Sequence, residues 1–235
     1  MEKAIWERWV SRMHWISERV RAKGGEVEGP EIWPPVSLSQ AKEFKHITGL
    51  SLPEDFVEMI TKFSGGFRFA WSLDDCNDLR KDFPVSGGNW EVPFIGVSEQ
   101  RPLVEVYLEF QKEFREGALN WIYHAEFDHH EDIRLTRHVL PYCFPLYVFY
   151  GNGGDFLVLR FDVEPSQVLY LDHEWGFSVR GRALIGKGLR EFMETWSKLG
   201  YPEVDRYSVF FDEDKGMISA ENKVGQEWIR WLEEE

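Results

Sequence analysis

The sequence predicts an α+β fold: one domain with a mainly antiparallel sheet of five or six strands, against which helices pack. Two observations lead to this prediction. Segments with apolar residues at helical spacing alternate along the chain with short aromatic and branched runs that glycines bound. A glycine-rich turn at residues 151–154 separates two such runs, 146–150 and 156–161, and predicts a buried β-hairpin at the centre of the sheet.

Composition excludes some classes of protein and leaves others open. At 235 residues the chain is long enough for a substantial core, and no apolar run approaches the roughly 20 residues of a membrane span. The 27 basic and 41 acidic residues give a net charge of −14, which argues against nucleic-acid binding and permits a basic partner. The acids can also simply keep the surface soluble. Cys76 and Cys143 have no metal-type spacing, and the N-terminus lacks a signal-peptide pattern, so we expect a cytoplasmic protein without a bound cofactor.

The first 36 residues predict one helix and a connector. Apolar residues recur at helical spacing from Ile5 to Val20, which indicates an amphipathic helix that ends near Gly24. Gly29, Pro30 and the prolines at 34–35 then predict an extended connector.

Two capping-box patterns follow. Ser37 and Gln40 predict the start of a short helix that ends at Gly49. Ser51 and Glu54 fit the same pattern for a second helix, with Pro53 preset for its first turn. Residues 67–71 alternate as a first strand does.

The motif over residues 44–66 resembles the signature of the SUKH superfamily, also called the Smi/Knr family. It reads Phe44-(x)4-Gly49-Leu50-x-Leu52-Pro53-x-Asp55-Phe56-(x)6-Phe63-x-Gly65-Gly66, with Ser64 where the family usually has Asn. Gly153-Gly154-Asp155, the strand at 156–161 and Asp172-His173-Glu174 after a further strand are similar to its second half. The resemblance spans residues 38 to about 199. It implies a core at 37–200, with residues 1–36 before it and an extension at 201–235 after it.

The segments between and after these motifs predict a loop, an edge strand, further helices, a short hairpin and an insertion. Residues 74–89 predict a surface loop, and 90–97 an edge strand because Pro93 interrupts it. A helical stripe from Leu103 to Phe114 lies in a segment, 99–140, that the family core lacks, so it predicts an insertion. A helix over 185–199, a short hairpin at 207–218 and a last helix capped by Ser219 complete the chain.

One cluster in the insertion invites a metal-site interpretation, because imidazoles and carboxylates bind divalent ions. Its residues are His124, Asp128, His129, His130 and Asp132. The second histidine of a His-Glu-x-x-His motif is missing, and so is the Pro-Cys-x-x-Cys of a zinc deaminase. The cluster is either adventitious surface charge or the metal site of a metal-dependent hydrolase, and the spacing of its residues favours surface charge.

The glycine-rich turn could also suggest a phosphate cradle. It has no Gly-Lys-Ser/Thr, leads into a strand and carries Asp155, which would repel an anion. Asp155 therefore either caps the turn or faces a partner.

No nucleophile, paired carboxylates or cofactor loop is evident, so the sequence favours a binding module over an enzyme. Members of the family that the chain resembles include immunity proteins that block bacterial toxins, some of them nucleases, by direct contact, and regulatory scaffolds in fungi. The resemblance and the charge together imply occlusion of a basic toxin domain, without nucleic-acid or membrane binding. A regulatory scaffold is the second alternative after the hydrolase. The residues predicted to face the partner are Trp71, Asp74, Asp75, Asp128, Glu131, Asp132, Asp155, Asp172, His173 and Glu174.

Overall fold

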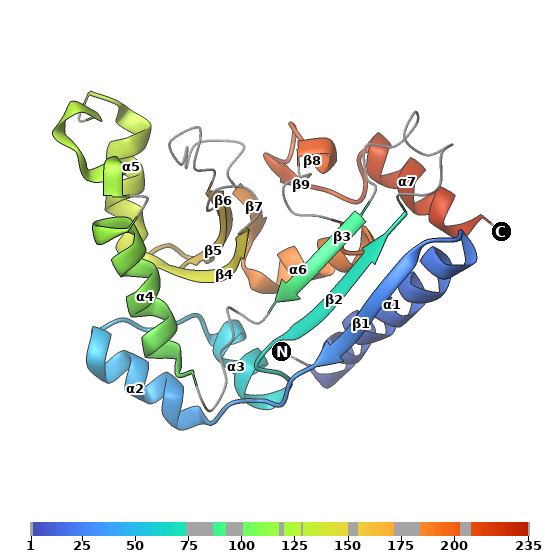
Figure 1. Cartoon of the computed structure of the whole chain (residues 1–235), viewed down its shortest axis with the longest axis horizontal. Helices are drawn as coiled ribbons and strands as arrows, with labels where there is room; N and C mark the ends of the chain where they lie inside the picture. Colours follow the sequence, from blue (N-terminus) through green and yellow to red (C-terminus); the bar gives the residue numbers. More distant parts are fainter. Residues whose placement is uncertain are drawn as a thin grey trace.

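The computed structural model describes residues 2–73, 87–92, 101–117, 120–127, 129–149, 155–171, 184–202 and 208–234 (Figure 1). The α-helices in these ranges are α1 (Lys3–Ala22), α2 (Leu38–Thr48), α3 (Glu54–Lys62), α4 (Leu103–Glu116), α5 (Glu131–Val139), α6 (Leu189–Lys198) and α7 (Lys223–Glu233). Short 3₁₀ turns are η3 (Asn120–Tyr123), η4 (Ala125–Phe127) and η5 (Leu140–Tyr142). The strands are β1 (Glu26–Ile32), β2 (Phe67–Ser72), β3 (Gly87–Val92), β4 (Cys143–Phe149), β5 (Asp155–Arg160), β6 (Gln167–Leu171), β7 (Leu184–Lys187), β8 (Phe211–Asp212) and β9 (Met217–Ile218).

The described strands form three antiparallel sheets. Their orders are β1-β2-β3, β4-β5-β6-β7 and β8-β9. The α+β class and the antiparallel pairing are confirmed, including the predicted hairpin, in which Phe149 pairs with Asp155. The expectation of one sheet of five or six strands is corrected: the described strands divide into sheets of three, four and two.

β1 occupies the segment predicted as an extended connector. It is an edge strand that pairs only with β2 in its sheet, and Pro30 lies where the register shifts between Glu28 and Glu31. An edge strand tolerates proline, because the missing N–H leaves no ladder bond broken on the open side. Gly29 has φ +81°, and a Cβ there would lie 2.6 Å from the Arg68 carbonyl oxygen. The Gly-Pro pair thus forms a strand irregularity, and the sequence pattern alone does not distinguish this from a connector.

Three predicted caps differ from those observed. For α3 the cap residue is Pro53, without a side-chain cap hydrogen bond, in place of the predicted Ser51. At Ser37, the cap residue of α2, no side-chain cap hydrogen bond forms, and the Gln40 Oε1 accepts from the Leu103 N–H at 3.2 Å, which ties α2 to α4. For α7 the cap is Asn222, whose Oδ1 accepts from the Gly225 N–H at 2.7 Å, in place of the predicted Ser219. The end of α2 at Gly49, with φ +73°, is as predicted.

Ser64, which departs from the family pattern, makes the turn between α3 and β2 with its hydroxyl. Its Oγ donates to the Gly66 carbonyl and accepts from the Gly66 N–H at 3.0 Å, and the side chain is buried. Tyr201 is the non-glycine residue with positive φ in the described part of the chain. A left-handed conformation, for which Asn would be preferred, is therefore not needed at position 64.

The sheet β4-β5-β6-β7 is buried on both faces. Along β5, Leu157 and Leu159 face a first core that also includes residues of α1, α3, β2, α6 and α7, while Phe156 and Val158 face a second core. This second core comprises Phe110, Phe114, Ile122, Ile133, Val139, Leu140, Cys143, Phe156, Val158, Leu169 and Leu171. The predicted insertion, which contains α4 and α5, thus covers the outer face of the sheet (Figure 1). Burial on two faces explains why residues 156–159 of β5 are all apolar instead of alternating.

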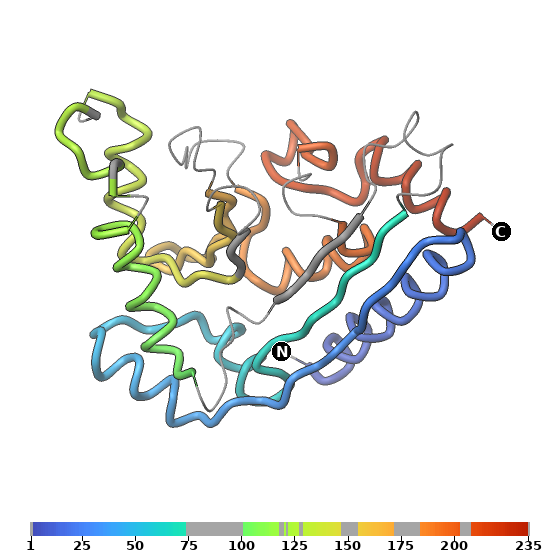
Figure 2. Tube along the Cα trace, in the orientation of Figure 1, coloured from blue at the N-terminus to red at the C-terminus, as the bar shows by residue number. Residues whose placement is uncertain are grey.

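The C-terminal end of α6 joins segments from the whole chain. Four consecutive carbonyls there accept hydrogen bonds from side chains of α1, β2 and α7. The pairs are Arg12 with Ser197 (3.2 Å) and Lys198 (3.1 Å), Trp228 with Leu199 (2.7 Å), and Trp71 with Gly200 (2.9 Å). The first and last helices, α1 and α7, contact each other near here and lie side by side in Figure 2. Residues 1–36 and 201–235 therefore share the first core with residues 37–200.

Candidate functional site

Four of the ten residues predicted to face a partner fall in the described part of the chain. They are Trp71, Glu131, Asp132 and Asp155. The other six, Asp74, Asp75, Asp128, Asp172, His173 and Glu174, lie outside the described residues.

Trp71 belongs to the core, so its assignment to a partner-facing surface is corrected. The side chain is 4 % exposed and stacks on Trp228 with ring centroids 5.9 Å apart. Its indole N–H donates to Gly200, which lies 129 residues further along the chain. A tryptophan that is buried on all sides and hydrogen-bonded has no face left for a partner.

Asp155 is also buried, at 5 % exposure, so it does not present a charge to a partner. One carboxylate oxygen accepts from the hydroxyl of Tyr170 at 2.7 Å. Asp155 begins β5 and Tyr170 lies on the neighbouring strand β6, so this bond joins two strands of the sheet. Asp155 therefore has a structural role within the sheet. The turn pattern does not reveal this role, because the hydroxyl comes from another strand.

Glu131 and Asp132 form the first turn of α5. Acids in this position are favoured by the helix dipole, which supplies a local reason for both residues. Glu131 is exposed and Asp132 is half-buried. Both can still contribute charge to a surface.

The histidines of the proposed metal cluster lie on the surface. His124 is 52 % exposed, with Nδ1 3.7 Å from an oxygen of Glu126, and the rings of His129 and His130 are 4.1 Å apart. Across the described ranges no three His, Cys, Asp or Glu side chains come together in a way that could hold a metal ion. Asp128, another of the five proposed ligands, lies outside those ranges.

An acidic recess of about 480 Å³ lies where three separate segments meet. They are the N-terminal end of α3, the turn between β5 and β6, and the junction of β7 with α6. We call it the acidic recess; its charged residues are Glu54, Asp55, Glu58, Glu164, Lys187 and Arg190. Four carboxylates against two cations give it a net charge of −2, of the same sign as the whole chain.

Two of the four carboxylates are held by the fold. Asp55 accepts from the Phe56 N–H at 2.8 Å and from the Arg190 N–H, in the first turn of α6, at 3.4 Å. Glu58 pairs with Lys62 at 2.8 Å. Glu54 and Glu164 are exposed and make no ion pair with the described part of the chain. These two acids can therefore receive a cationic group without losing an existing partner.

Sequence patterns identify half of the recess. The Leu52-Pro53 motif predicts the helix start that carries Glu54 and Asp55, but Glu164 lies in a turn with no motif of its own. Its position opposite α3 depends on how β5 and β6 pack, which local patterns do not encode.

No helix in the described ranges is both long and apolar enough to cross a bilayer. Comparison of the chain with protein-family models, with curated proteins and with solved structures found no match.

Proposed function

We propose that this chain is a non-enzymatic protein-binding module that docks a basic partner at the acidic recess. The observation that supports this function is that Glu54 and Glu164, two exposed carboxylates without an ion pair among the described residues, line one concave site. A lysine or arginine side chain of the partner fits between them, because such a contact adds charge-assisted hydrogen bonds without breaking existing ones.

The negative charge of the whole chain also favours binding of a basic partner. With 41 acidic and 27 basic residues, the field around the protein attracts cationic partners and raises their association rate at low salt. At physiological ionic strength this attraction is screened beyond roughly 8 Å, so the residues at the recess itself decide specificity.

The partner class follows from the resemblance described above. Pro53 and Asp55, two residues of the motif that resembles the SUKH superfamily, line the recess. We propose that the partner is a basic bacterial toxin domain, such as a nuclease, and that the chain neutralises it by occlusion. A regulatory scaffold that binds a basic protein of the cell is the alternative, and genomic neighbourhood separates the two, since an immunity gene lies beside a toxin gene.

The test is a binding measurement with the toxin domain encoded next to this gene. Glu54→Lys with Glu164→Lys should weaken binding by about tenfold or more, because two attractive contacts become repulsive. Glu43→Lys with Glu18→Lys is the matched control, since both acids are exposed on helices outside the recess. The control should reduce the association rate by a small factor through net charge alone.

An equal loss in the two double variants would contradict docking at the recess, because only overall charge would then matter. Absence of binding by the unaltered chain at low salt, where electrostatic steering is strongest, would contradict the toxin-binding function itself.

A further inference from the structure

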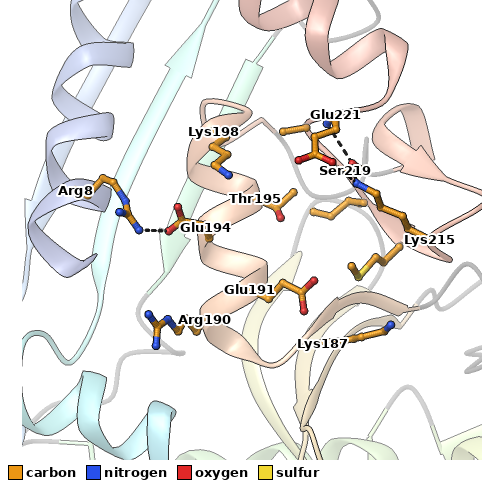
Figure 3. A pocket seen from close by; sticks show the side chains of 13 residues that line it. Arg8, Lys187, Arg190, Glu191, Glu194, Thr195, Lys198, Lys215, Ser219 and Glu221 are labelled. Carbon is orange, nitrogen blue, oxygen red and sulfur yellow. Dashed lines mark hydrogen bonds and ion pairs between the residues drawn. The ribbon is translucent and has the colours of Figure 1, made fainter. Parts of the chain in front are cut away.

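A second pocket, of about 520 Å³, lies between α6 and the hairpin β8-β9. Figure 3 shows Glu191 and Thr195 projecting from α6 toward the hairpin, with Lys215 on the facing side and Lys187 at the end of β7. We call it the basic pocket. Its cationic residues are Arg8, Lys187, Arg190, Lys198 and Lys215.

The charge of the basic pocket is opposite to that of the chain. Five cations and three acids, Glu191, Glu194 and Glu221, line it, for a net charge of +2. The whole chain has 27 basic and 41 acidic residues, so random sampling of its charges would give more acids than bases. A concave site that reverses this ratio gathers cations whose mutual repulsion is relieved when an anion binds.

Ion pairs within the basic pocket account for only two of the five cations. Arg8 pairs with Glu194 at 2.7 Å, and Lys215 contacts Glu221 at 2.6 Å and the Ser219 hydroxyl at 3.0 Å. Lys187, Arg190 and Lys198 make no side-chain ion pair with the described part of the chain.

Lys198 lies between the two ion pairs. Its charge helps to lower the pKa of Glu221, after the larger effect of the hydrogen bond from Lys215. Burial raises the pKa of Glu194, and the charge of Lys198 acts with the hydrogen bonds from Arg8 and Trp9 and the charge of Arg8 to lower it overall. Lys198 thus faces a carboxylate on each side and is bonded to neither, so it can turn to a ligand.

We propose that the basic pocket binds a small phosphate-bearing anion, which Lys187, Lys198 and Lys215 contact as point charges. The hydroxyls of Thr195 and Ser219, which also line the pocket, supply further hydrogen bonds. Lysine is a common phosphate ligand, and the volume is within the range of roughly 300–1,000 Å³ of small-molecule sites. Glu191 opposes the anion and limits its affinity. The basic pocket shares Lys187 and Arg190 with the acidic recess, but its proposed ligand is an anion and the proposal does not depend on the docking of a basic protein.

The first test is a titration of the full chain with inorganic pyrophosphate at constant ionic strength, followed by amide NMR and calorimetry. Saturable shifts should appear at Thr195 and Ser219. Lys187→Gln with Lys198→Gln should weaken binding by at least about tenfold, because two charge-assisted contacts are lost. Lys42→Gln with Lys45→Gln, two exposed lysines of α2 outside the pocket, is the matched control and should bind as the unaltered chain does.

The second test moves the affinity in the opposite direction. Glu191→Gln removes the acid that opposes the anion and should tighten pyrophosphate binding several-fold, which damage to the fold would not do. Glu43→Gln on α2 is its control and should have no effect. The proposal is overturned if pyrophosphate gives no saturable shifts at millimolar concentration, if the α2 lysine variant loses as much affinity as the pocket variant, or if Glu191→Gln fails to tighten binding.

Discussion

The two ends of α6 differ in how the rest of the chain meets them. At the C-terminal end, side chains from three distant elements bond four consecutive carbonyls, and the donors Trp71 and Trp228 are buried. At the N-terminal end, the cap residue is Gly188, the Arg190 N–H of the first turn donates one long hydrogen bond to Asp55 at 3.4 Å, and exposed charges lie nearby. The C-terminal end of α6 is therefore fixed by hydrogen bonds from distant elements, whereas its N-terminal end presents charged groups to solvent.

The difference shows how an acidic protein can separate stability from binding. Buried carbonyls need donors, so the C-terminal end can change little without loss of stability. The exposed charges near the N-terminal end contribute little to folding, because water screens them. We call the C-terminal end of α6 the closed end and its N-terminal end the open end. Substitutions at the closed end should mainly change stability, and substitutions of the exposed charges at the open end should mainly change binding.

The largest effect is expected for Trp228→Ala at the closed end. The side chain is fully buried, and its removal should lower the free energy of unfolding by about 3–5 kcal/mol, through lost burial and the lost bond to Leu199. Urea unfolding measures the change. Trp228→Phe keeps a ring in place and should cost about 1–3 kcal/mol. A cost below about 1 kcal/mol for the alanine variant would show that α7 is not part of the folding unit.

A smaller loss is expected for Arg12→Ala. The guanidinium bonds the Ser197 and Lys198 carbonyls and lies 3.6 Å from the ring centroid of Trp15, so its removal should cost about 2 kcal/mol. Arg12→Lys retains the charge but loses the planar fork, and should recover less than half of this loss. Full recovery by lysine would mean that charge alone, and not the paired hydrogen bonds, matters at this end of α6. Thermal and urea unfolding of both variants provide the measurement.

At the open end, Asp55→Ala should lower the free energy of unfolding by about 1 kcal/mol, as loss of a helix cap does. Glu54→Gln, one residue earlier and exposed, should leave stability unchanged within about 0.5 kcal/mol. Equal losses in the two variants, measured by urea unfolding, would contradict a capping role for Asp55.

The smallest effect concerns pH and Glu194, which lies on α6 between the two ends. Burial raises its pKa, but the hydrogen bonds from Arg8 and Trp9, together with the charges of Arg8 and Lys198, bring it below the ordinary value of 4.5. A lowered pKa in the folded state stabilises the protein above pH 4.5, and this contribution is lost as pH falls through the folded-state value. The side chain is 29 % exposed, so screening keeps the contribution below about 1 kcal/mol.

The measurement is the difference in unfolding free energy between the unaltered chain and Glu194→Gln, followed from pH 7 to pH 3. The difference should shrink as the carboxylate of the unaltered chain becomes protonated. A difference that stays constant across this range would show that the charge of Glu194 does not contribute to stability.

Local patterns predicted most helices and the hairpin. The helix expected over 185–199 begins only at Leu189, because residues 184–187 pair with β6 as strand β7. The stripe from Ile5 to Val20 became α1, Gly49 ended α2, and the runs on either side of the glycine-rich turn became β4 and β5. These predictions hold because periodicity and turn chemistry act over a few residues. β1 was missed because an edge strand with a proline has the same local pattern as a connector.

Predictions of individual site residues were weaker. Trp71 and Asp155 precede or follow a polar loop in the sequence, and that position suggested exposure. Both are buried because their partners, Gly200 and Tyr170, come from other elements. Glu164 and Lys198 carried no motif, so no local pattern marked them as members of a recess or a pocket.

By itself the sequence determined the α+β class, most helix and strand positions, and the excess of acids. Only the tertiary structure decided which charges lie together: it placed Glu54 and Glu164 in the lining of one recess and gathered five cations in a pocket of an acidic chain. The physical reason is distance along the chain. Arg8 and Glu194 are 186 residues apart in sequence and 2.7 Å apart in space, and only the packing of α1 against α6 brings them together.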